Sequence, residues 1–123
     1  MPLGKRELAR IERRLITTLT EACETAKGEI IGFAWLTHIA DLNALAETLT
    51  VIWVFETLAD RKLALVDAKA RIFELTSIAL NDANIYLIPS DHSVRFDSEE
   101  ECQRTHGGDW KIRLTQSRVA KGG

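Results

Sequence analysis

Hydrophobic positions along the chain follow two spacing rules. Some runs repeat every three or four residues, as in an amphipathic helix, and others alternate residue by residue, as in a strand. In chain order the runs are helical 5–27, strand-like 30–40 and 49–57, helical 60–80, and strand-like 92–97 and 110–116. The order α-β-β-α-β, with one more strand, predicts an α+β fold with a three- or four-stranded sheet, mixed or antiparallel.

Each long helical run has one apolar stripe. The first stripe is Leu8, Ile11, Leu15, Leu19, Ala22 and Ala26, and the second is Leu63, Val66, Ala70, Phe73, Ser77 and Leu80. Gly28 is the predicted stop of the first helix, and Thr57 with Asp60 is a capping pattern for the second. Two helices with one stripe each need a shared sheet, so both are expected on one sheet face.

The strand-like runs predict which side chains share a face. Ile31, Phe33, Trp35, Thr37 and Ile39 alternate along the first run and are expected under the helices. The second run is apolar on both faces, which indicates a central strand. Run 110–116 alternates with charged residues, as an edge strand does.

Two connections are also predicted. Residues 41–48 lack Gly and Pro and are expected to form a one-turn helix or a bulged hairpin loop. Ser98 followed by three glutamates predicts a short capped helix that ends before Gly107.

Composition bounds the class of protein. The 123 residues, 46% apolar and 28% charged, fit one soluble domain over 1–123 with a disordered tail from about 117 to 123. No run of eighteen apolar residues and no secretory signal is found, so we expect a cytoplasmic protein without a membrane span. Cys23 and Cys102 match no metal or redox spacing and are read as free thiols.

Charge is unevenly distributed. Residues 1–14 carry five basic and two acidic groups, and residues 103–123 carry five basic groups and one acidic group, which leaves 15–102 at net −9. Basic ends around an acidic body indicate either contact with an anionic partner or solubility alone.

Few residues suggest chemistry. His38 and Asp41 could transfer protons, although no nucleophile or glycine-rich loop accompanies them. His92, Cys102 and His106, with Asp91, make only half of a zinc motif. The acidic residues Glu29, Asp41, Glu56 and Asp60 could hold magnesium, but strand ends and helix caps explain them equally well. Without a nucleotide-binding, hydrolase or zinc-protease motif, we expect no enzyme, cofactor or metal.

The layout resembles that of ribosome-binding factor A, a family with a type II KH-like fold and a kinked second helical region. The resemblance covers residues 5–97 and rests on RELARIERRLITTLTEA, GFAWLTHIADLNALAETLTVIWVF, DRKLALVDAKARIFELTSIAL and HSVRF. The Gly-x-x-Gly loop of KH domains and the family's Ala-x-Gly kink are both absent. That leaves NDAN, around residue 82, as the candidate helix break.

The resemblance implies an RNA- or ribosome-associated accessory protein. Its phosphate contacts would be Arg6, Arg10, Arg13, Arg14, Lys111, Arg113 and Arg118, brought together on one face. No DNA-binding motif is found. The alternative is a non-enzymatic interaction module that forms a homodimer through its sheet surface, with Trp53 and Phe55 at the interface.

Overall fold

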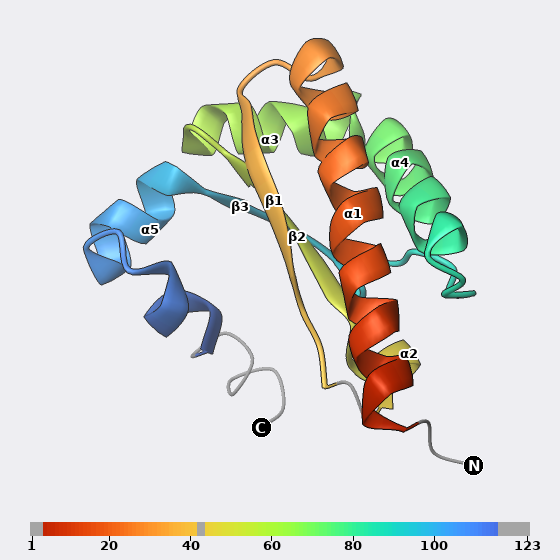
Figure 1. Ribbon diagram of the computed structural model, residues 1–123. Coiled ribbons are helices and arrows are strands. Elements are labelled where there is room, and N and C mark those ends of the chain that lie inside the picture. The colour runs from red at the N-terminus through yellow and green to blue at the C-terminus, as the bar shows by residue number, and fades with distance from the viewer. Residues whose placement is uncertain (1–3, 42–43, 116–123) are drawn as a thin grey trace.

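Three strands form one mixed sheet that carries helices on both of its faces (Figure 1). The computed structural model describes residues 4–41 and 44–115. The elements are α1 (Lys5–Glu29), β1 (Phe33–Ile39), α2 (Leu45–Thr48), β2 (Thr50–Phe55), α3 (Leu58–Asp67), α4 (Lys69–Asp82), β3 (Val94–Ser98) and α5 (Glu99–His106). The predicted α+β class is confirmed. The predicted tail over 117–123 lies outside the described residues.

Strand β2 is the centre of the sheet. It pairs antiparallel with β1 and parallel with β3, and all six of its residues are buried. The parallel pairing requires a crossover, which α3 and α4 provide. The prediction that the second strand-like run is central is therefore confirmed.

One face of β2 forms the main core. Val51, Trp53 and Phe55 point toward α1 and α4 and are not exposed at all. Phe33 lies 5.1 Å from Trp53 between ring centres, and Phe55 stacks on Phe96 at 6.0 Å. The prediction of an interface at Trp53 and Phe55 is wrong, because this aromatic cluster holds both side chains inside the single chain.

A bulge in β1 changes the predicted faces of that strand. Phe33 pairs with Phe55 but Trp35 pairs with Val54, so one extra residue is inserted at Ala34. The insertion reverses the alternation beyond it. Trp35 and the alternate positions after it therefore lie on the outer sheet face, away from α1, which corrects the predicted burial under the helices.

The predicted helix over 60–80 is two helices. Thr57 caps α3 through its hydroxyl, which accepts from the backbone N–H of Asp60, as the capping pattern predicts. The break is at Ala68, with φ −122° and ψ 2°, and this backbone needs no glycine. The expectation of a break in NDAN is wrong, because α4 continues to Asp82.

The break divides the second apolar stripe. In α4, Leu80 is buried together with Ile72 and Leu75. In α3 the stripe turns outward, and Val66 is 80% exposed. Helix α3 instead contacts the β2–β3 side of the sheet through its own buried Ala64. Only α1 and α4 therefore share the sheet face as predicted.

The predicted edge strand over 110–116 is also wrong within the described chain, because residues 110–115 are helical. Gly107 and Gly108 have positive φ values, 60° and 87°, and end α5. The Asp109 carboxylate then accepts from the N–H of Ile112 and starts a new turn. The short helices α2 and α5 and the late strand β3 agree with expectation, and α1 continues through Gly28 to Glu29.

Candidate nucleic-acid interface

The solvent side of the first half of α1 carries three arginines close together, beside the exposed Lys5 and Glu7. Arg6, Arg10 and Arg13 follow at spacings of four and three, opposite the buried stripe that holds Leu15 and Leu19. All three are exposed, and within the described residues none of their side chains has a hydrogen bond or ion pair. We call these three residues the arginine face.

The arginine face opposes the helix dipole. The N-terminal end of a helix is partly positive, so cations there lower helix stability. Residues 5–14 nevertheless carry five basic and two acidic groups, whereas 15–29 carry three acidic groups and one lysine. Because Arg6 lies in the first turn, where a cation lowers helix stability, the stability of α1 does not explain this residue.

Arg14 has a structural role instead. Its guanidinium donates to the carbonyl oxygen of Asp82 at 2.7 Å and so satisfies the end of α4. At the other end of the same helix pair, Arg71 donates to both carboxylate oxygens of Glu29 at 2.8 Å. These two contacts fix α4 along α1, and Arg14 is not part of the arginine face.

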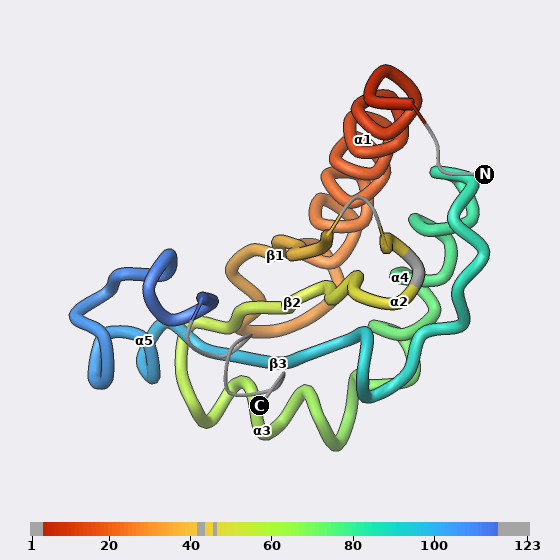
Figure 2. The backbone as a smooth tube through the Cα atoms, turned by 90° about the horizontal axis from the view of Figure 1, so that it is seen from below, coloured from red at the N-terminus to blue at the C-terminus, as the bar shows by residue number. Residues whose placement is uncertain are grey.

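The C-terminal basic residues lie elsewhere. Trp110 contacts Trp35 on the outer sheet face, so segment 110–115 and the arginine face are on opposite sides of the sheet (Figure 2). The Arg113 guanidinium donates twice to Asp97 at 2.8 Å, which raises the pKa of Arg113. Lys111 is exposed, and Arg118 lies outside the described residues. The predicted convergence of both ends is not found for the described residues.

A polar network holds segment 110–115 against the sheet. The indole N–H groups of Trp35 and Trp110 both donate to one carboxylate oxygen of Glu99, at 2.6 and 3.0 Å. Together with the Asp97–Arg113 pair, this network explains Asp97, Glu99 and Arg113 at the outer face without a ligand. Sequence reasoning missed the network because its members come from four separate elements.

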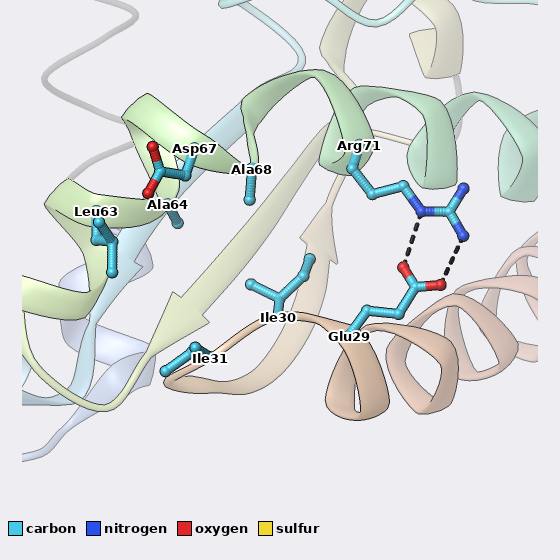
Figure 3. Close-up of a pocket in the computed structure, with 8 residues that line it drawn as sticks. All are labelled: Glu29, Ile30, Ile31, Leu63, Ala64, Asp67, Ala68 and Arg71. Atoms are coloured by element: carbon cyan, nitrogen blue, oxygen red, sulfur yellow. Dashed lines mark hydrogen bonds and ion pairs between the residues drawn. The ribbon is translucent and has the colours of Figure 1, made fainter.

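A pocket of about 260 Å³ lies beside the break at Ala68 (Figure 3). Ile30 and Ala64 form part of its apolar lining, and the Glu29–Arg71 pair forms one side. The guanidinium of Arg71 also donates to Glu74, and both partners raise its pKa. The polar groups of the pocket are thus largely paired with each other, and no catalytic arrangement results.

His38 has a different acidic neighbour from the one expected. Its Nε2 lies 3.9 Å from a carboxylate oxygen of Glu12 on α1. Burial lowers the pKa of His38, and the charge of Glu12 opposes that shift. The backbone N–H of Asp41 donates to Thr48, which fixes the end of β1. The structure therefore does not reproduce the suggested His38–Asp41 pair.

The suggested metal ligands do not converge in the described part of the chain. Among residues 4–41 and 44–115, no three His, Cys, Asp or Glu side chains are placed to share an ion. Cys102 is fully buried, and burial raises the pKa of its thiol.

Comparisons with protein-family models, curated proteins and solved structures found no match to this chain. Within the described residues, no helix has both the length and the apolar character needed to cross a membrane.

Proposed function

We propose that this chain is an RNA-associated accessory protein that binds the phosphate backbone through the arginine face of α1. The observation that carries the proposal is that Arg6, Arg10 and Arg13 are exposed and have no ion pair among the described residues. Arg6 also lies in the first turn of α1, where a cation costs stability. Arginine suits this task because its planar guanidinium donates to two phosphate oxygens at once.

The arrangement of elements supports a type II KH-like assignment. The order α-β-β-α-β and a broken second helical region are features of ribosome-binding factor A, which this chain resembles. The break falls at Ala68-Lys69-Ala70, where an alanine stands in place of the glycine of an Ala-x-Gly kink. Ribosomal RNA is accordingly the class of partner that we propose.

The mode of binding follows from the missing Gly-x-x-Gly loop. Without that loop the backbone cannot clamp a strand as KH domains do. Contacts by side-chain charge alone carry little sequence information and weaken as salt displaces them. We therefore expect binding that is tolerant of sequence and strongly dependent on salt.

The test is a titration of fluorescent ribosomal RNA fragments with the full chain at several salt concentrations. The variant Arg6→Ala/Arg10→Ala should bind about tenfold more weakly at low salt, and its log–log salt slope should fall by about 1.5. The matched control is Lys27→Ala/Lys62→Ala, which removes the same charge from two exposed residues outside the arginine face.

The two variants discriminate between a site and a general charge effect. If both variants lose the same affinity for RNA, the binding is nonspecific charge attraction and the arginine face is not a site. If the arginine variant keeps the affinity of the wild type, the proposal is wrong.

A further inference from the structure

An apolar surface lies at the mouth of the pocket beside the break between α3 and α4. Leu63 and Ile31 line this pocket and are 48% and 79% exposed, and Val66, one turn after Leu63 on α3, is 80% exposed. We call these three residues the apolar rim. Leu63 and Ile31 lie at one end of the pocket, and the Glu29–Arg71 pair lies at the other (Figure 3). Large apolar side chains exposed together mark a surface that binds a partner.

The pocket is already formed in the free chain. A Cβ atom at Gly32 would lie only 2.3 Å from the Cγ atom of Asp60, so the turn between α1 and β1 lies directly against the start of α3. The carbonyl oxygen of Gly32 also accepts from the N–H of Glu56 at 2.9 Å. At the other end, the Glu29–Arg71 pair fixes α1 to α4. Because both walls are held within the chain, a ligand can bind with little reorganisation of the protein.

The size of the pocket favours the side chains of a larger partner over an enclosed small molecule. Its volume of about 260 Å³ is below the roughly 300 to 1,000 Å³ of sites that enclose drug-sized ligands. The apolar rim also extends past the pocket to Val66, which a ligand confined to the pocket would leave in water. A polypeptide that inserts one or two apolar side chains and runs along α3 would cover both.

The charges around the pocket favour a cationic partner. Among the described residues that line it, Arg71 is the one cation, and its guanidinium is already bound to the carboxylates of Glu29 and Glu74. Asp67 also lines the pocket and is exposed, and its carboxylate has no hydrogen bond or ion pair within residues 4–41 and 44–115. These carboxylates outnumber the guanidinium, so Asp67 is available to a lysine or arginine of the partner.

Neighbouring positive groups do not cancel this negative charge. Lys69, the first residue of α4, is paired with Asp91 at 3.1 Å. Lys27 and Lys62 are exposed but do not line the pocket. The C-terminal end of α3 and the N-terminal end of α4 meet at Ala68, so their partial charges offset each other, whereas the C-terminal end of α1 adds a partial negative charge. The field at the pocket therefore attracts a basic segment.

We propose that the pocket and the apolar rim bind a basic segment of a protein partner, in which a large apolar residue stands close to a lysine or arginine. The apolar side chain enters the pocket between Leu63 and Ile31, and the cation pairs with Asp67. This inference does not depend on RNA binding, because the arginine face lies on the first half of α1 and the pocket lies at the last residue of that helix.

The test begins with random dodecapeptides that are displayed on phage and selected against the immobilised full chain. Enriched peptides should combine Leu, Ile, Phe or Met with a nearby Lys or Arg. The most enriched peptide is then synthesised with a fluorophore and titrated with the full chain by fluorescence anisotropy. In NMR spectra of the chain, the peptide should shift the amide signals of Ile31, Ala64 and Ala68.

Two exposed positions test the apolar and the charged contact separately. Leu63→Glu should weaken peptide binding about tenfold, as the loss of a central apolar contact does. Asp67→Lys should weaken it about fivefold. A peptide whose basic residues are replaced by glutamate should bind Asp67→Lys more tightly than the wild type, which a loss of folding could not produce. The control Ile78→Glu should keep the wild-type affinity, because Ile78 is 49% exposed on α4 and lies outside the pocket.

Several outcomes would overturn the proposal. Selection that enriches acidic peptides or none, a Leu63→Glu variant with the wild-type affinity, or an equal loss in Ile78→Glu would each contradict it. Light scattering tests for a second copy in the pocket. A wild type at twice the 13.8 kDa of one chain, returned to 13.8 kDa by Leu63→Glu, would assign the pocket to that copy and overturn the proposal.

Discussion

At the scale of single residues, burial and local partners explain side chains that the sequence made ambiguous. His38 looks like a member of a His–Asp pair because Asp41 is three residues away. The bulge at Ala34 places His38 on the helix face of β1, where Glu12 is its acidic neighbour. A contact between α1 and β1 depends on tertiary packing, so no local pattern could have predicted it.

This position predicts an acid-sensitive stability. Because burial lowers the pKa of His38 from 6.5, the folded chain binds the proton less readily than the unfolded chain. The free energy of unfolding should fall as pH drops through 6.5 and level off below the folded pKa. His38→Gln should flatten this dependence in urea unfolding at about pH 8 and about pH 5. The comparison variant His92→Gln, at an exposed histidine, should retain it.

At the scale of elements, the sequence predicted the number and type of most segments because periodicity reports which face is buried. The predictions were wrong where one local feature changed which face of an element is buried, or changed the direction of the chain. The bulge at Ala34 moved Trp35 to the outer face, and the break at Ala68 exposed Val66. Segment 110–115 alternates as a strand would, yet Trp110 and Arg113, three residues apart, both reach the sheet from a helix.

The reversed charge order of α1 gives a prediction for that helix. Arg6→Glu places a carboxylate at the partly positive helix end and should raise the free energy of unfolding by about 0.5 kcal/mol at low salt. The same change at Arg13, beyond the first turn, should lack this dipole gain. Thermal unfolding checks both. A loss of stability in Arg6→Glu would mean that the arginine supports the fold after all.

At the scale of the whole molecule, the sheet lies between two unequal layers. Helices α1 and α4 cover one face with a continuous apolar core, whereas α5 and segment 110–115 lie on the other (Figure 2). There a polar network surrounds the Trp35–Trp110 contact beside the buried Ile52 and Val54. The sequence predicted the layer of α1 and α4, because each of the two long helical runs has an apolar stripe. It could not foresee the second, because hydrogen bonds between distant residues leave no periodic signal.

The second layer should therefore depend on few contacts. Arg113→Met leaves the carboxylate of Asp97 buried with, among the described residues, only the Ser98 N–H as a donor, and should cost about 2 to 3 kcal/mol in urea unfolding. Tryptophan fluorescence should report the separation of Trp110 from Trp35. The matched change Lys111→Met, at an exposed neighbour, should have little effect, and equal losses in both variants would contradict this account.

The parallel pairing of β2 with β3 also affects the order in which the chain folds. Strand β1 lies close to β2 in sequence, so their hairpin closes a short loop, whereas 38 residues separate the end of β2 from the start of β3. Closing the longer loop costs more chain entropy before any contact compensates it. The hairpin can form early, but the inner edge of β2 stays unpaired until α3 and α4 are in place. The folding rate should therefore depend on the crossover helices even where the final stability does not.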